Sequence, residues 1–169
     1  RGFTATKISD VVEEAGVSHG LVYHYFKSKE EIFYELLKRA MQTSGESLLT
    51  AEGIQARPIE KVRNIAQYIL GGIENFGDSA YYFMIAAHAS VMEGPSGNEK
   101  IMEGSMVPVW SMVRILKAGQ EAGEIREGDP MGMAMAFFAA IQGLAQFKLA
   151  IGNFKMPDPE ILVNMVKKP

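Results

Sequence analysis

The stretch that decides the fold is residues 2–33, GFTATKISDVVEEAGVSHGLVYHYFKSKEEIF. Thr6 is placed as a helix N-cap, and an apolar stripe at i, i+3, i+4 and i+7 follows it over residues 8–15. Gly16 then supplies the left-handed conformation with which helices commonly end. Ser18 is a second N-cap, and its helix would pack through Leu21, Val22, Tyr25 and Phe26. Two helices joined by about three residues predict a helix-turn-helix.

Downstream of this stretch, the pattern stays helical. Ser28 and Glu31 form an S-x-x-E capping box, which predicts a third helix running as far as about Leu49. Further helices are expected from Pro58 to about Gly77, over 78–91, over roughly 101–122, over 130–151 and over 158–168. Pro108 should kink the helix over roughly 101–122 or reset its start. Asp129-Pro130 and Asp158-Pro159 each read as an N-cap followed by a proline at the first helical position. No stretch alternates with period two, so the predicted fold class is all-α.

The segment 130–151 is almost entirely apolar, and its length approaches that of a membrane span. Gln142, Gln146 and Lys148 interrupt it, which favours a helix buried on most of its sides in a globular protein. Burial all round requires more partners than one small domain offers. Small residues permit close approach of a second helix, so we expect a homodimer interface that includes Ala136, Ala139, Ala140 and Gly143.

Bulk composition narrows the class of protein. The 169 residues carry a formal net charge of -3, which argues against a protein that coats nucleic acid along its whole surface but allows a local DNA-binding face. The absence of cysteine excludes a disulfide framework and thiolate metal sites, and it fits the cytoplasm. Because the chain starts at Arg1 rather than at methionine, we expect further residues upstream, including the start of a first helix.

The distribution of charged residues within the helix-turn-helix favours DNA binding. No acidic side chain occurs from Ser18 to Lys29, although Glu13, Glu14, Glu30 and Glu31 flank this segment. A phosphate backbone could therefore approach here without charge repulsion. Ser18, His19 and Gly20 open the second helix, where helix N-termini favour phosphates and present base-reading groups. Tyr25 and Phe26 are interpreted as core residues rather than DNA contacts.

This stretch closely resembles the TetR family of bacterial repressors. The resemblance is carried by Gly2-Phe3, Ala15-Gly16-Val17-Ser18, Tyr23-His24-Tyr25-Phe26 and Lys27-Ser28-Lys29-Glu30. The resemblance covers about the first quarter of the chain. It implies a helix-turn-helix DNA-binding domain over 1–45, with its first helix truncated, and a helical-bundle ligand-binding and dimerisation domain over 46–169. It also implies phosphate contacts and base-facing positions, which together comprise Thr6, Ser18, His19, Gly20, Leu21, Tyr23, His24 and Lys29. Leu21 could touch a thymine methyl but cannot read a hydrogen-bond pattern.

Eight of the eleven methionines fall between Met84 and Met135, among many aromatic residues. Such a composition is typical of an ordinary soft core, and it also suits a pliable apolar pocket. The resemblance implies a pocket enclosed by the helices at 58–76, 104–122 and 130–151, and pairing of 130–151 with 158–168 across a dimer. The candidate ligand-binding residues are Tyr68, Phe83, His88, Met106, Trp110, Phe138, Gln142 and Gln146.

The resulting hypothesis is a ligand-responsive regulator, acting as a repressor, that binds a palindromic operator as a dimer and is released by a small apolar or amphipathic effector. Two alternatives stay open. A helix-turn-helix can bind a protein partner, in which case salt-sensitive DNA affinity would be missing. An enzyme would show turnover that depends on His88 or a nearby carboxylate. Common catalytic motifs are missing from the sequence, as is helical spacing of metal-ligating histidines, so we expect no enzyme activity, metal or cofactor.

Overall fold

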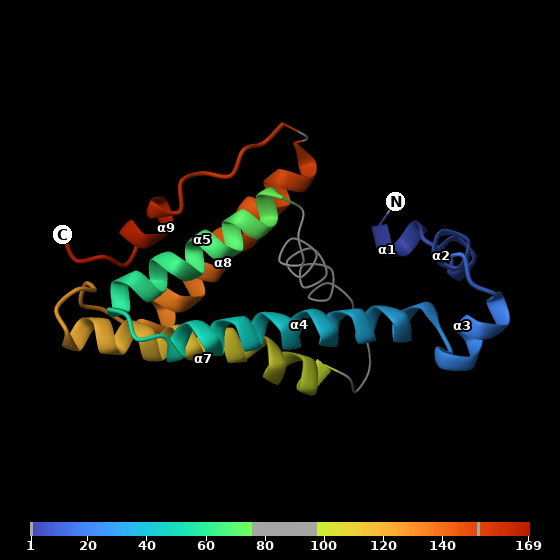
Figure 1. Ribbon diagram of the computed structural model, residues 1–169, viewed down its shortest axis with the longest axis horizontal. Helices are drawn as coiled ribbons and strands as arrows, with labels where there is room; N and C mark the ends of the chain where they lie inside the picture. Colours follow the sequence, from blue (N-terminus) through green and yellow to red (C-terminus); the bar gives the residue numbers. More distant parts are fainter. Residues whose placement is uncertain (1, 76–97, 152) are drawn as a thin grey trace.

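The computed structural model describes residues 2–75, 98–151 and 153–169, and over these residues the fold is helical (Figure 1). The helices are α1 (Gly2–Ala5), α2 (Ile8–Ala15), α3 (His19–Tyr25), α4 (Lys29–Gly53), α5 (Pro58–Glu74), α7 (Asn98–Glu121), α8 (Pro130–Ala150) and α9 (Glu160–Asn164). The helix predicted over 78–91, with Phe83 and His88, lies outside the described residues. The predicted all-α class is confirmed.

Local hydrogen bonds explain the short helices at the N-terminus. Gly16 ends α2 with φ of 63°, the left-handed conformation that the sequence predicts. The Ser18 hydroxyl accepts from the Leu21 amide at 3.2 Å and caps α3. Ser28 caps α4 in the same way, accepting from the Glu31 amide at 3.2 Å. Thr6 is not the cap of α2, because that helix begins one residue later.

Lys7 occupies the cap position of α2, and its amide donates to the Asp10 carboxylate at 2.9 Å. A carboxylate three residues into the helix can thus satisfy the cap amide without a serine or threonine at the cap.

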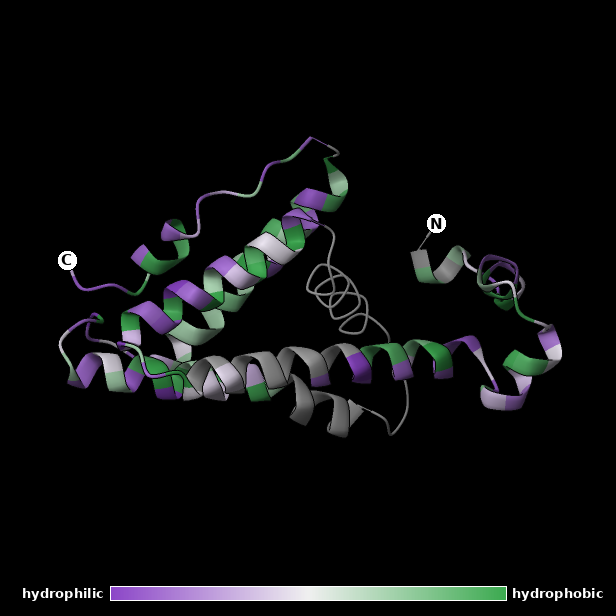
Figure 2. Cartoon of the chain, viewed as in Figure 1, coloured by the Kyte–Doolittle hydropathy of each residue, from purple (hydrophilic) through white to green (hydrophobic). Residues whose placement is uncertain are grey.

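Beyond α4, the main core lies among α5, α7 and α8, which contact one another, with α9 packed on α5. Pro58 opens α5 as predicted. Hydrophobic and hydrophilic residues alternate around α5, as expected for a helix with one buried face (Figure 2). Side chains from all four helices and from the loops form a single cluster, in which the largest fully buried members include Leu70, Ile73, Met112, Leu116, Phe137, Ile141 and Leu162.

The sequence suggested that helix α8 is buried on most of its sides. In the single chain it is buried on one face only. Met133, Ala134, Phe137, Ile141, Ala145 and Lys148 are buried, whereas Met135, Ala136, Ala139, Gln146 and Phe147 are exposed. The helix is long and apolar enough to cross a membrane by length and composition alone. Its buried face, however, belongs to the core shared with α5 and α7. The exposed apolar face is the part of α8 that the single chain leaves uncovered.

Two other helix boundaries differ from the prediction. Helix α7 is already helical at Asn98, the first residue described after 75, and Pro108 lies inside it rather than at its start. The helix expected over 158–168 is only Glu160–Asn164, although the Asp158 carboxylate accepts from the Glu160 amide as a cap would.

The chain leaves this helix early because its last residues pair elsewhere. The Arg126 amide donates to the Val166 carbonyl at 2.9 Å, and the Lys168 amide donates to the Glu124 carbonyl at 3.0 Å. This short antiparallel bridge satisfies backbone groups that a longer helix would have used internally, and it lets the Val166 side chain be buried.

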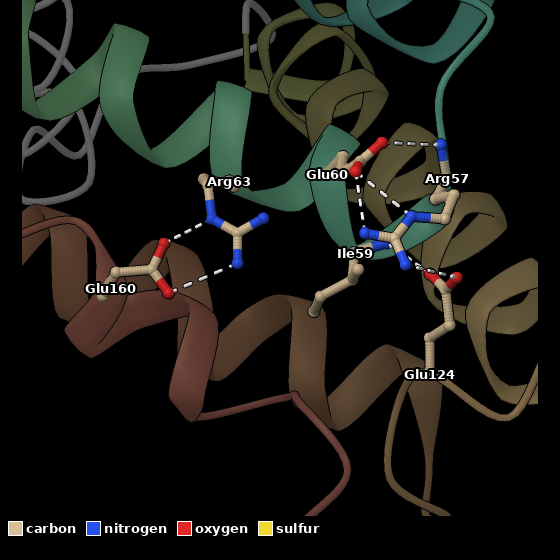
Figure 3. A network of polar contacts seen from close by, with 6 residues as sticks. All are labelled: Arg57, Ile59, Glu60, Arg63, Glu124 and Glu160. Carbon is tan, nitrogen blue, oxygen red and sulfur yellow. Dashed lines mark hydrogen bonds and ion pairs between the residues drawn. The ribbon is translucent and has the colours of Figure 1, made fainter.

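Ion pairs and hydrogen bonds fasten the elements around α5 (Figure 3). The Glu124 carboxylate accepts from the Ile59 amide at 3.1 Å and lies 3.9 Å from the Arg57 guanidinium, so the α7–α8 loop holds the start of α5. Arg63 pairs with Glu160 of α9 through both carboxylate oxygens. Arg63 also holds the pKa of the Glu160 carboxyl below its usual value.

At the other end of α5, the buried Lys148 ammonium donates to the Glu74 carboxylate and to the Phe154 carbonyl, both at 2.9 Å. The Met156 amide donates to the same Glu74 oxygen at 3.0 Å. These bonds, the Met156 amide first and the Lys148 ammonium second, lower the pKa of Glu74. Desolvation of Lys148 is thus offset by two acceptors, and the segment after α8 is tied to α5.

Candidate nucleic-acid interface

Helix α3 presents most of its side chains to solvent. Leu21, Tyr23 and Tyr25 are 47%, 54% and 66% exposed, and His19, Gly20 and His24 are also exposed. Only Val22 of this helix, together with Phe26 just after it, is half-buried. A short helix held by so narrow an apolar edge leaves its remaining surface available to a partner.

The interpretation of Tyr25 as a core residue was wrong. Its ring stands edge-on to the His24 ring with centroids 5.0 Å apart, and most of its surface is open. An aromatic residue in an apolar spacing pattern predicts burial only if a neighbouring element covers it. Helix α3 contacts α2 and lies at the far end of the molecule (Figure 1). The apolar pattern therefore predicted more buried residues in α3 than the structure has.

Charge around α3 follows the sequence prediction. Lys27, just beyond α3, is exposed, while the exposed acidic residues Glu13 and Glu14 are on α2. The carboxyls of Glu30 and Glu31 lie on the first turn of α4, where they serve the helix cap. The Lys27 amide donates to Glu31, and Glu30's own amide and the Ser28 hydroxyl lower the pKa of Glu30. These carboxylates are therefore committed to the α4 N-terminus, and residues 18–29 remain without a negative side chain.

Two predicted phosphate contacts have partners inside the protein. The Lys29 ammonium donates to the Phe3 carbonyl at 2.7 Å and to the Thr6 carbonyl at 2.9 Å, and it is half-buried. Thr6 is also half-buried. The other predicted DNA-facing residues, Ser18, His19, Gly20, Leu21, Tyr23 and His24, lie together on the exposed part of the turn and α3.

Comparison with known proteins defines this part of the chain. Residues 1–36 match the family model described as bacterial regulatory proteins, tetR family. The N-terminal module belongs to the TetR family. The chain is also 23% identical to an HTH-type transcriptional regulator of Bacillus subtilis named YfiR. The 138 aligned residues cover 82% of this chain and 67% of that protein. It is 31% identical to the transcriptional repressor KstR2 of Mycobacterium tuberculosis over 75 residues. This alignment covers 44% of this chain and only 38% of that protein.

Solved structures show that the TetR-like fold extends over the whole chain. A TetR-family regulator from Agrobacterium tumefaciens aligns with a TM-score of 0.83 over 99% of this chain and 90% of its own, at 16% identity. AibR, solved in complex with isovaleryl coenzyme A and operator DNA, aligns with a TM-score of 0.79 over 97% of this chain and 86% of its own, also at 16% identity. At such identities the likeness concerns the fold alone.

The residues predicted to line a ligand pocket in this TetR-like fold are scattered in exposure. Tyr68 on α5, Trp110 on α7 and Gln146 on α8 are exposed, whereas Met106 on α7 and Phe138 and Gln142 on α8 are half-buried. Phe138 packs against the core, edge-on to Phe137 with ring centroids 5.6 Å apart. Phe83 and His88 lie outside the described residues. The pocket therefore stays a prediction.

Proposed function

We propose that this protein is a ligand-responsive transcriptional regulator of the TetR type, acting as a repressor in the cytoplasm. The observation that carries the proposal is α3, an exposed helix free of carboxylates, held at the end of a long helix that leads into a separate helical core. Its TetR-family module matches a family of regulatory proteins, and KstR2, to which the chain is similar, is a repressor. The function is regulation and not catalysis.

Helix α3 would enter the major groove with its first residues toward the bases. His19, Gly20 and Leu21 face base edges, and Gly20 has no side chain to hold the backbone away from them. Ser18, Tyr23 and His24 approach the phosphates on either side, with Thr6 near the start of α2. Tyr25, exposed beside His24, would be a further contact.

A homodimer would place two copies of α3 on the same side of the DNA. The uncovered face of α8 supports it, because Met135 and Phe147 are 57% and 54% exposed and Ala136 and Ala139 lie between them. Ala139 is four residues after Met135 and Phe147 is eight residues after Ala139, spacings that return to the same side of a helix, so these residues form one stripe. A second copy of the helix can approach closely over the alanines, and the two exposed large side chains would then be buried.

The effector would act by changing the distance between the two recognition helices. Helix α4 spans 25 residues, about 36 Å at the usual rise, and contacts both α5 and α7. It runs without a break through the domain boundary predicted at residue 45, so a shift of its C-terminal half moves the DNA-binding end. A ligand releases DNA only to the extent that it binds the DNA-free arrangement more tightly.

The proposed effector is a small apolar or amphipathic molecule. A methionine-rich helical domain suits such a ligand. AibR, which shares the fold, was solved with isovaleryl coenzyme A, which joins a small apolar acyl group to a polar carrier. The candidate contacts remain Tyr68, Phe83, His88, Met106, Trp110, Phe138, Gln142 and Gln146.

Selection of genomic DNA fragments by the purified protein at moderate salt tests the proposal. We expect enrichment of one palindromic site, and we expect Tyr23→Ala and His24→Ala to weaken binding to it while the protein stays dimeric. A well-folded dimer that enriches no sequence would contradict the proposal and favour a helix-turn-helix that binds a protein partner.

A further inference from the structure

We propose that Lys29 is a positioning residue, which fastens the N-terminal segment onto the first turn of α4 and so sets the orientation of α2 and α3 relative to that helix. The inference rests on the proposed DNA-binding function. It assigns Lys29 a different role from the phosphate contact that resemblance implies.

Lys29 reaches back across 26 and 23 positions of sequence to the Phe3 and Thr6 carbonyls, at 2.7 and 2.9 Å. Its charged end also lies over the Phe3 ring, 4.3 Å from the centroid. The two carbonyls flank the end of α1, where helix carbonyls lack partners within the helix and attract a cation. One side chain thus holds the last turn of α1, the residue directly after it and an aromatic ring.

The same ring connects to the interior of the module. Phe3 packs against the buried Phe33 of α4 with ring centroids 4.9 Å apart and planes at 59°. Phe33 in turn meets Tyr34 edge-on. Lys29 and Phe33 are one helical turn apart on α4, so they hold Phe3 from two adjacent positions of the same helix face.

A phosphate contact would compete with this arrangement. Both carbonyl bonds are of ordinary charge-assisted length. To reach a phosphate with its full ammonium, Lys29 would have to move away from two part-buried acceptors and from the Phe3 ring. The Phe3 and Thr6 carbonyls would then lose the hydrogen bonds that Lys29 donates to them. Lys27, two residues earlier and exposed, can approach DNA without such a loss.

The consequence concerns transmission along α4. Helix α3 joins α4 through Phe26, Lys27 and Ser28, a short covalent link that sets distance but leaves the angle adjustable. The Lys29 and Phe3 contacts provide a second, non-covalent attachment some twenty residues away in sequence. Two attachments fix a direction where one does not, so a movement of α4 is carried into α2 and α3 as a unit.

The test compares wild type with Lys29→Met, which keeps an apolar stem of similar length and removes the donors. Affinity is measured for the selected operator and for unrelated duplex DNA over a series of salt concentrations. Lys27→Met is the matched control, since it removes the same charge from an exposed position two residues away. Phe3→Leu is the second variant; it disturbs the attachment without changing any charge.

For Lys29→Met and Phe3→Leu, operator affinity should fall by about five- to a hundredfold, comparable with loss of a base contact. Affinity for unrelated DNA and the salt slope should stay near the wild-type values. Lys27→Met should leave the ratio of the two affinities unchanged. The proposal is overturned if Lys29→Met weakens both DNAs equally and lowers the salt slope by about 0.9, as loss of one phosphate contact would.

If Lys29→Met unfolds the module, that variant would lose its affinity for both the operator and unrelated DNA. Phe3→Leu would then decide the question, because a wild-type ratio of operator affinity to unrelated-DNA affinity in this variant also overturns the proposal. Failure of the wild-type protein to prefer any operator would instead reject the proposed function itself.

Discussion

Replacing Gly20 by alanine should raise the stability of the protein while lowering its affinity for operator DNA. Gly20 lies in the first turn of α3, and a Cβ built there meets no atom within 4 Å. Alanine is favoured over glycine in helices by about 0.5–1 kcal/mol, and nothing in the surroundings opposes this gain. For a chain of this size, the increase corresponds to roughly 1–4 °C in Tm.

The operator complex should respond in the opposite direction. If the start of α3 lies against the base edges, the added methyl group occupies the closest approach, and a displacement equivalent to one lost base contact costs about 1–3 kcal/mol. Gly71→Ala is the control, because Gly71 lies inside α5 and its added Cβ also meets nothing within 4 Å. It should give a similar rise in Tm with unchanged DNA affinity.

Thermal unfolding and fluorescence anisotropy with labelled operator measure the two quantities on the same preparations. Higher Tm with undiminished operator affinity in Gly20→Ala would refute the placement of this residue at the DNA. A lower Tm would refute the local reasoning, because it would mean that the position does not behave as an open helical site.

Three further predictions concern the helical domain. Phe137→Ala should destabilise the fold by about 3–5 kcal/mol in denaturant titration, because this ring is fully buried at the centre of the α5, α7 and α8 core; a change below 1 kcal/mol would show that the site collapses around the gap. Glu74→Gln should lower Tm at neutral pH, since the folded protein holds the pKa of Glu74 below its ordinary value of 4.5. That stabilisation is present above pH 4.5 and is lost as pH falls through the lowered pKa, so the Tm difference should shrink in acid, and a pH-independent difference would argue against the ionic contribution. Phe147→Glu should convert the dimer to a monomer in sedimentation velocity, with Lys155→Glu as an exposed control nearby; a Phe147→Glu protein that stays dimeric would exclude this face of α8 as the interface.

Much of the N-terminal module could be predicted from local chemistry. Gly16, Ser18 and Ser28 act through their own backbone or through an amide three residues away, so the sequence determines their structure directly. Asp129 and Pro130 start α8 for the same reason. Even here the cap of α2 was misplaced by one residue, because Asp10 can satisfy the Lys7 amide and a threonine is not needed.

Features that depend on distant partners were not predictable. The role of the Lys29 ammonium requires carbonyls more than twenty residues away, and α9 is short because Val166 and Lys168 pair with the α7–α8 loop. The apolar spacing of α3 predicted a core position for Tyr25, yet none of the elements that the structure describes covers it. Similarly, the uniformly apolar α8 suggested burial on most sides, and the single chain buries one face.

The central claim is that two copies of α3 read one operator on the same face of the duplex. Hydroxyl-radical footprinting of the wild-type protein on its selected site tests it most directly. We predict two protected half-sites related by a two-fold axis, with centres about 34–36 Å apart or at a wider spacing that keeps them on one face. A single protected segment without two-fold symmetry, or half-sites on opposite faces of the duplex, would contradict it.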